Sequence, residues 1–295
     1  MIKKILSLSA MLMICLSLCS CDVFRTVETE KVMQETAPYE TIETSPVTET
    51  VPETTVAPET GPTPVIPTRD PSAPPTICID AGHGYVDPGC STDYINGLNE
   101  SDIVSEYADV LKAALEDMGY RVILLRDNDK YVTAEEISAA ADKMGMTYLK
   151  DKLVDDRRFA PYNRAVWANV IHRETYIDLF ISLHIDSYDA MESVRGTRVY
   201  YCSENNYSAD SQNLCASVVG AIDSALPSQG TRVYPVPYKD AFVVTKHTEM
   251  PSMLIEMGFA TNKTDAENII DEEWRLAFTS AVAEGIKNFV EGYVK

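Results

Sequence analysis

The chain has 295 residues and carries 45 acidic against 25 basic side chains, giving a formal net charge of -20. This length allows one or two domains. The acidic balance argues against a nucleic-acid partner, because binding to phosphates requires clustered Lys and Arg side chains.

Residues 1–21 have the features of a lipoprotein signal peptide. Two lysines precede an apolar run over residues 5–18, and this run is short for a membrane-spanning helix, which needs about 20 apolar residues. The segment LCSC at 18–21 resembles the lipobox of bacterial lipoproteins. We therefore expect cleavage before Cys21 and a lipid on its thiol, which would anchor the protein to a membrane face. An ordinary signal peptide is the alternative.

Residues 22–76 have the composition of a disordered linker. The stretch 22–75 holds 10 of the 16 prolines, many threonines and repeated Thr-Glu and Pro-Glu units. It has too few large apolar side chains to offset the entropy lost on ordering. Residues 77–295 are long enough for one well-buried domain, and they contain no internal repeat.

The first half of this domain reads as a strand, a helix and a second strand, which is typical of a parallel βαβ unit. The strand at 77–79 runs into a loop of small residues, Ser101 caps an amphipathic helix over 101–118, and the second strand covers 121–126. Thr133 and Glu136 form a capping-box pattern ahead of a helix over 134–143.

The second half continues the alternation of helices and strands. Pro161 starts or interrupts a helix within 155–172. The other predicted strands cover 176–183, 196–202, 241–244 and 252–257, and the other helices cover 208–226, a short segment from 264 or 265, and 272–293. The pattern predicts an α/β domain.

Histidines at two strand ends are the candidate metal ligands. His83 lies between glycines after the first strand, and His184 ends the strand over 176–183. With Glu100 they give a set of two imidazoles and one carboxylate that leaves a fourth position open, as catalytic zinc sites do. Taken singly, each histidine could be a turn or core residue. His172 is predicted to lie on the surface, and His247 is an outside candidate for substrate contact.

The remaining cysteines do not indicate a thiolate site. Cys78, Cys90, Cys202 and Cys215 lack CxxC spacing. Export permits disulfides between them, and free buried thiols are equally consistent with the sequence.

Glu256 ends a hydrophobic strand, where a charged group needs a partner. Beside a zinc-bound water, it could accept the proton of that water and pass it to a leaving amine. The alternative is a structural carboxylate paired with Arg164 or another cation.

Six motifs resemble, in order, the zinc-dependent N-acetylmuramoyl-L-alanine amidases of bacterial cell-wall turnover. They are IDAGHGYVDPG, GLNESDIV, LLRD, RAVWAN, DLFISLHID and MPSMLIEMGFATN. The resemblance implies a mostly parallel, mixed six-stranded sheet covered by helices, with Zn²⁺ as cofactor and peptidoglycan as substrate. It implies zinc ligands at His83, Glu100 and His184, with Glu256 as the catalytic glutamate. The implied activity is hydrolysis of the bond between N-acetylmuramic acid and L-alanine. With a lipid on Cys21, this would occur on the outer face of the cytoplasmic membrane.

Other positions match the family pattern in part. Arg164 and Asn169 match the R-x-x-x-A-N motif and are candidates for substrate binding or support. Asp186 stands where the family's S-x-H-x-N segment has Asn, and residues 127–159 are longer than in minimal members. A helix in that insertion could shape the groove or occlude the metal.

Two alternatives to an amidase remain open at this point. One is another zinc peptidase or deacetylase acting on wall material, and the other is a non-catalytic wall-binding lipoprotein. No activator protein is identified by these motifs.

Overall fold

The computed structural model describes residues 66–126, 131–147, 149–155, 157–226, 231–234 and 236–293. The predicted signal peptide, Cys21 and most of the predicted linker lie outside these residues. No helix of the described part is long and apolar enough to cross a membrane. The C-terminal end of the predicted linker belongs to the folded domain, since Arg69 Nε donates to Asp178 Oδ1 at 2.6 Å and Thr76 is the first residue of a strand.

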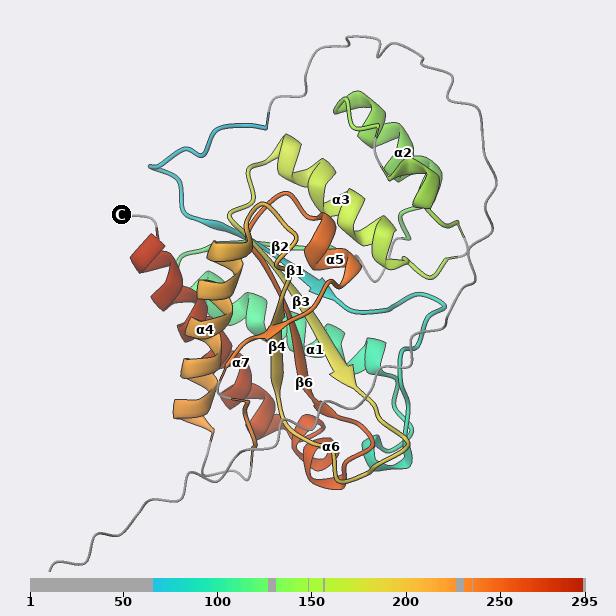
Figure 1. The fold of residues 1–295 in the computed structure, drawn as a ribbon, viewed down its shortest axis with the longest axis vertical. Coiled ribbons are helices and arrows are strands. Elements are labelled where there is room, and N and C mark those ends of the chain that lie inside the picture. The colour runs from blue at the N-terminus through green and yellow to red at the C-terminus, as the bar shows by residue number, and fades with distance from the viewer. Residues whose placement is uncertain are drawn as a thin grey trace, which may run out of the picture. The chain divides into compact units, whose positions relative to one another are not determined.

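A six-stranded sheet forms the centre of the molecule, with the strand order β2-β1-β3-β6-β4-β5 (Figure 1). Strand β1 pairs in parallel with β2 and β3, and β3 pairs in parallel with β6. Strand β4 is antiparallel to β6 and parallel to β5. The predicted mixed, mostly parallel sheet is therefore confirmed. The bounds are β1 (Thr76–Ala81), β2 (Arg121–Leu124), β3 (Leu179–Asp186), β4 (Arg198–Tyr201), β5 (Tyr238–Lys239) and β6 (Ser252–Phe259).

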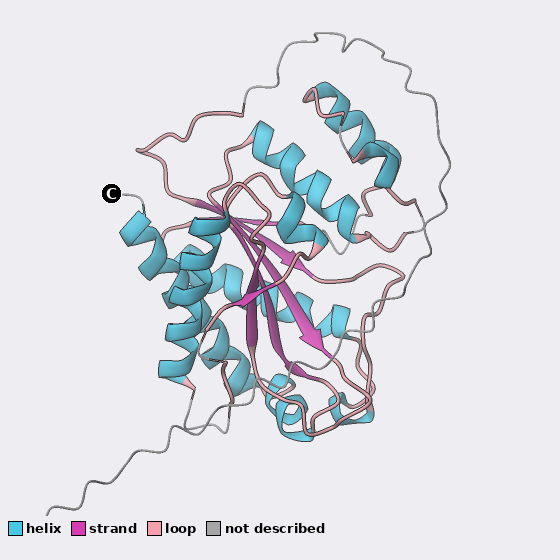
Figure 2. Ribbon diagram, viewed as in Figure 1, coloured by secondary structure: helices cyan, strands magenta, loops and turns pink. Residues whose placement is uncertain are grey.

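Helices cover both faces of this sheet (Figure 2). Helices α1, α4, α6 and α7 contribute to the hydrophobic cluster on one face, and α2, α3 and α5 contribute to the cluster on the other. Successive residues of β1 point to opposite clusters, Ile77 and Ile79 to the first and Cys78 to the second. The bounds are η1 (Asp93–Ile95), α1 (Glu100–Asp117), α2 (Ala134–Lys143), η2 (Lys150–Lys152), α3 (Pro161–Glu174), α4 (Ser208–Ala225), α5 (Val243–His247), α6 (Lys263–Ile269) and α7 (Glu272–Tyr293).

Local signals at helix starts are confirmed in one case and wrong in another. Thr133 and Glu136 form the predicted capping box before α2. Ser101 is not an N-cap, because α1 already begins at Glu100. Pro161 is the first residue of α3, so this helix starts later than the predicted 155.

The predicted strand over 241–244 is wrong. Residues Val243–His247 form helix α5, while the two-residue strand β5 lies just before it. The run Ala-Phe-Val-Val favours a strand by propensity, but α5 packs against α3 and buries Val244 and Thr245. Tertiary packing overrides β-propensity here.

The predicted surface position of His172 is also wrong. Its side chain is buried on α3, and its Nδ1 accepts a hydrogen bond from the Ile177 backbone N–H at 3.0 Å. Burial lowers the pKa of His172, since the charged form would lose its hydration.

Cys78, Cys90, Cys202 and Cys215 are free thiols. Of the two possibilities left open by the sequence, the structure has the free cysteines.

Candidate metal centre

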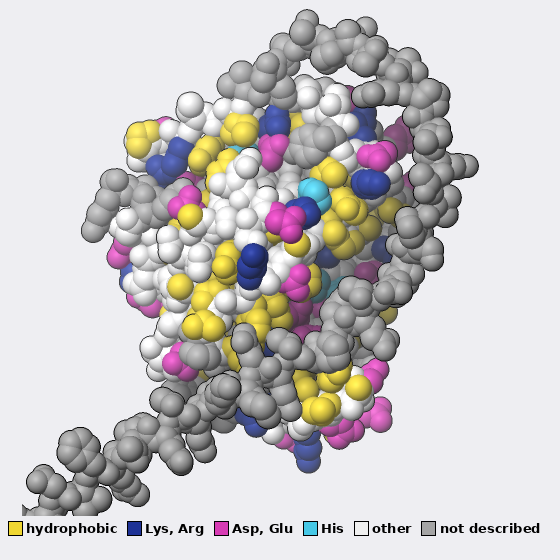
Figure 3. All heavy atoms as spheres, in the orientation of Figure 1, with side chains coloured by type: hydrophobic (Ala, Val, Ile, Leu, Met, Phe, Trp, Pro, Cys, Tyr) yellow, Lys and Arg dark blue, Asp and Glu magenta, His cyan; other side chains and the backbone are white. Residues whose placement is uncertain are grey.

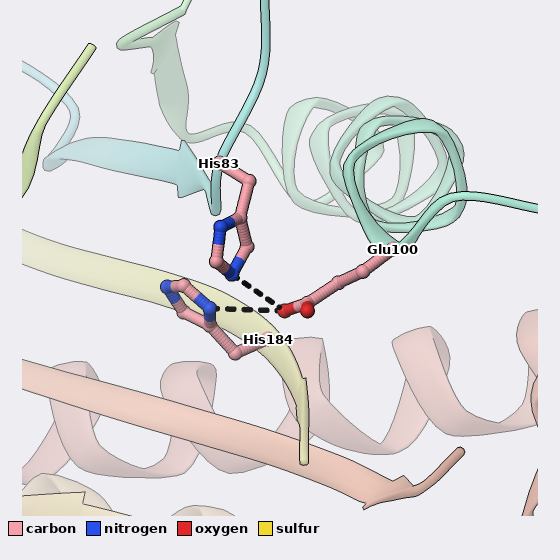
Figure 4. A group of neighbouring side chains, drawn as sticks. All are labelled: His83, Glu100 and His184. Carbon is pink, nitrogen blue, oxygen red and sulfur yellow. Dashed lines mark hydrogen bonds and ion pairs between the residues drawn. The ribbon is translucent and has the colours of Figure 1, made fainter. Parts of the chain in front are cut away.

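Three elements bring His83, Glu100 and His184 together at the carboxyl edge of the sheet. His83 follows β1, Glu100 is the first residue of α1, and His184 lies in β3 (Figure 4). His83 Nε2 and His184 Nδ1 each lie 3.1 Å from Glu100 Oε1. One donor atom from each of the three residues lies within 4.8 Å of the other two. The structure therefore brings the three predicted ligands together.

Two glycines provide the space that these side chains occupy. A Cβ at Gly82 would lie 2.4 Å from Cε1 of the His184 ring. A Cβ at Gly89 would lie 2.6 Å from Glu100 Oε2 and 2.8 Å from His83 Cδ2. Any other residue at either position would collide with a ligand, which explains why small residues follow β1.

His83 itself has an unusual backbone conformation. Its φ angle is 58°, in the left-handed region that non-glycine residues rarely adopt. Such a conformation persists only where the surrounding structure enforces it, and it is commonest at functional sites.

Asp87 orients His83 from behind. His83 Nδ1 lies 3.0 Å from Asp87 Oδ2, and Asp87 Oδ1 accepts from the Gly89 N–H at 3.1 Å. A carboxylate on the second ring nitrogen fixes the tautomer in which Nε2 can bind a metal. Sequence reasoning missed Asp87, although a carboxylate four residues after His83 in the same loop was the available signal.

Backbone groups hold the carboxylate of Glu100. Oε1 accepts from the Ile185 N–H at 3.0 Å, and Oε2 accepts from the Cys90 N–H at 2.9 Å. Burial alone would raise the pKa of Glu100, but its hydrogen bonds to His184 and His83 hold that pKa well below its usual range. The side chain is therefore ionised, as a metal ligand must be.

Arg164 lies behind His184 and is almost fully buried. Its Nη1 donates to Asp80 Oδ2 at 2.9 Å and lies 3.4 Å from His184 Nε2. Ser182 Oγ donates to the same Asp80 oxygen at 2.8 Å. Burial, with the charge of Arg164, lowers the pKa of His184 and keeps the ring neutral. This placement suits support of a ligand rather than contact with substrate.

Glu256 lies beside His184, on the neighbouring strand. It pairs with His184 in the register of β3 and β6, so the two side chains project from the same face. Arg164 does not neutralise Glu256, since that guanidinium pairs with Asp80 instead. Burial, with the charges of Asp186 and Glu100, raises the pKa of Glu256 well above its ordinary value. A carboxyl pKa raised from its ordinary value suits a group that both accepts and delivers a proton.

The two other predicted positions, Asn169 and Asp186, lie in different surroundings. Asn169 is fully buried away from the ligand set, where its Nδ2 donates to the His247 carbonyl at 2.7 Å and its Oδ1 accepts from the Glu249 N–H at 2.8 Å. It braces α3 against the end of α5. Asp186 lies at the end of β3 near the site, with Oδ2 3.6 Å from Arg198 Nη1.

The insertion before α3 forms a wall beside the site. Tyr85, two residues after His83, packs edge-on against Tyr131 and Phe159, at centroid distances of 4.9 and 5.8 Å. The His83 side chain remains 26% exposed.

On the face drawn in Figure 3, basic side chains of the described residues are scattered among acidic and hydrophobic ones.

The donor set fits a zinc ion. Two imidazoles and a carboxylate are ligands that zinc prefers at catalytic sites. One donor atom of each residue lies within 4.8 Å of the other two, so a single ion could reach all three.

Residues 77–288 match the sequence profile of a protein family described as N-acetylmuramoyl-L-alanine amidase. An uncharacterized protein of Bacillus subtilis, YqiI, is 28% identical over 228 residues, which cover 77% of this chain and 91% of that protein. The probable cell wall amidase LytH of Staphylococcus saprophyticus is 27% identical over 225 residues, covering 75% of this chain. The chain spans only 62% of the length of that relative.

A solved structure has the same fold. The N-acetylmuramoyl-L-alanine amidase of Clostridium difficile 630 superposes with a TM-score of 0.57 at 21% identity, covering 75% of this chain and 100% of that one.

Proposed function

The chain belongs to the N-acetylmuramoyl-L-alanine amidase family, and we propose that it hydrolyses the amide bond between N-acetylmuramic acid and L-alanine in peptidoglycan with the aid of zinc. The convergence of His83, Glu100 and His184 next to Glu256 carries this proposal. The three ligands would hold the ion, and Glu256 would supply acid–base chemistry.

The chemistry divides between the metal and the protein. A bound zinc ion would act as a Lewis acid toward the substrate carbonyl and the attacking water. Glu256 accepts the proton of the water that attacks the lactyl carbonyl, and it then delivers this proton to the departing alanine nitrogen. Asp87 and Arg164 act behind the ligands, where they fix the orientations of His83 and His184.

The proposed location of the protein in the cell envelope depends on its N-terminal sequence. Lipidation of Cys21 would place the domain on the outer face of the cytoplasmic membrane, with residues 22–65 as a spacer. Metabolic labelling with a palmitate analogue tests this, with Cys21→Ala as the unlabelled control.

Three other functions predict different outcomes. A zinc peptidase would shorten the stem peptides, and a deacetylase would remove acetyl groups from the sugars. A non-catalytic wall-binding protein would release nothing. The raised pKa of Glu256 beside a complete ligand set favours the amidase over a binding protein, which has no use for an acid–base group.

Mass spectrometry of purified peptidoglycan, digested with the protein and zinc, tests the proposal. We expect free stem peptides with N-terminal alanine, together with glycan strands that retain muramic acid. Glu256→Gln should keep its zinc and lose most turnover, whereas Glu267→Gln, on the exposed surface of α6, should behave as the unchanged protein. Shortened stems, deacetylated sugars, or full activity of Glu256→Gln would reject the assignment.

A further inference from the structure

A charged pair next to Glu256 has no part in the chemistry described above. Arg198 on β4 is paired with Glu256 in the register of β4 and β6, and its Nη1 lies 3.6 Å from Asp186 Oδ2. The register of β3 against β6 shifts between His184 and Asp186. Such irregularities re-aim a side chain, and this one brings Asp186 near Arg198.

Both members of the pair are partly open to solvent. Asp186 Oδ1 already accepts from the Ser187 N–H at 2.8 Å, whereas its Oδ2 has only the longer contact with Arg198 Nη1. The separation of 3.6 Å exceeds the length of about 2.7–2.9 Å found when charged groups share a hydrogen bond. The side chain of Arg198 is 21% exposed and that of Asp186 is 30% exposed. A third group can therefore approach the two from solvent.

Aromatic rings fix the guanidinium of Arg198. Its central carbon lies 4.6 Å from the centroid of Phe259, 5.0 Å from that of Tyr234 and 5.6 Å from that of Tyr238. Arg198 also hydrogen-bonds the Tyr234 and Tyr200 side chains, so its neighbours hold it in place while its Nη1 faces Asp186. Arg198 therefore presents an immobilised donor, and Asp186 presents an acceptor beside it.

A donor next to an acceptor is complementary to a carboxamide, whose oxygen accepts and whose NH₂ group donates. A carboxylate could accept from Arg198, but it has no hydrogen to donate to the Asp186 oxygens. An ammonium group would meet the charge of Arg198. The neutral amide matches both members of the pair.

Resting on the function proposed above, we propose that Arg198 and Asp186 bind the α-carboxamide of the second stem residue and discriminate against a free α-carboxylate there. In peptidoglycan this residue is D-glutamate linked through its side-chain carboxyl, so its α-carboxyl is either free or amidated. It follows the L-alanine whose nitrogen is released, and two extended residues span about 7 Å. Its α-substituent can therefore reach a pair adjacent to Glu256.

Two disaccharide-tetrapeptides that differ only in D-isoglutamine against D-isoglutamate test this proposal. The zinc-loaded protein should show a kcat/KM at least about tenfold higher for the amidated substrate, the effect of one hydrogen bond to a charged group. Asp186→Asn should reduce or invert this ratio, because an Asn amide can donate to the carboxylate. Arg198→Gln should lower kcat/KM for both substrates.

Controls separate selectivity from damage to the site. Zinc content of each variant shows whether the ligands remain in place, and Asp189→Asn, an exposed residue of the same loop, should keep the ratio of the unchanged protein. Equal kcat/KM for the two substrates would overturn the inference and leave the amidase intact. An unaltered ratio in zinc-replete Asp186→Asn would overturn it as well. Cleavage of neither substrate would reject the proposed function itself.

Discussion

Replacing Gly82 with alanine tests whether the loop after β1 is shaped to admit His184. The added Cβ would lie 2.4 Å from Cε1, 2.6 Å from Nδ1 and 2.7 Å from Nε2 of the His184 ring. Since unstrained contacts lie at about 3.5–4.0 Å, the ring must move by about 1 Å. Gly82 does not have a positive φ, so alanine can adopt its backbone conformation and the effect is confined to packing.

The expected loss is large for zinc and moderate for folding. Metal sites tolerate errors of only about 0.2 Å in ligand distance, so zinc affinity should fall by at least about tenfold, the lower end of the range for disturbed ligand orientation. Crowding should lower the free energy of unfolding by about 1–3 kcal/mol. Competition with a chromogenic chelator measures the first quantity, and urea unfolding of the metal-free protein measures the second.

Gly220→Ala is the matched control. Gly220 lies in α4 with open space around its Cβ position, so alanine should raise stability by up to about 1 kcal/mol and leave zinc affinity unchanged. If Gly82→Ala bound zinc as tightly as the unchanged protein, the close fit between this glycine and His184 would have no functional consequence.

Three further substitutions probe the groups behind the ligands and the buried core. Asp87→Ala removes the hydrogen-bond partner of His83 Nδ1 and should weaken zinc binding by about 10–100-fold in the chelator assay; unchanged affinity would contradict an orienting role. Arg164→Ala leaves the fully buried Asp80 without its cation and should cost about 3–5 kcal/mol in urea unfolding, whereas a cost below about 1 kcal/mol, typical of exposed pairs, would not fit a buried one. Burial lowers the pKa of His172 in the folded protein. Below the ordinary histidine pKa of about 6.5, the unfolded chain therefore binds more protons than the folded chain, so the free energy of unfolding should fall as the pH drops from 7 to 5. His172→Asn keeps an acceptor near the position of Nδ1 and should flatten this dependence; parallel stability–pH curves for the two proteins would exclude His172 as its source.

The central strands could be predicted because helices cover both faces of the sheet, so their sequences are almost continuously apolar. A continuous apolar run does not mark β5, because this strand has only two residues and lies in a proline-containing stretch. It also fails for α5, where β-branched residues form a helix because they pack against α3. Both errors concern elements whose conformation depends on contacts distant in sequence.

The metal ligands could be predicted because they lie near the ends of elements that the sequence marks clearly: His83 follows β1, Glu100 begins α1 and His184 lies near the end of β3. The groups that orient them are harder to find. Arg198 reaches Asp186 only through the antiparallel pairing of β4 with β6 and the register shift in β3. Neither feature leaves a signal in a single sequence, so the partner of Asp186 could not be predicted.

Helix α3 connects the insertion to the metal centre. One side of this helix carries Arg164, which lies against His184. Phe159 and Val166 belong to the same hydrophobic cluster as Ile137 and Ala141 of α2, and α2 packs on α3. The insertion therefore adds buried apolar surface to α3, the helix whose Arg164 supports His184. It contacts the front of the site through the loop that follows His83, and it leaves the His83 side chain partly exposed. The described part of the insertion thus supports the metal centre from behind through α2, and its Tyr131 and Phe159 form a wall beside His83, as expected of a segment that shapes the groove.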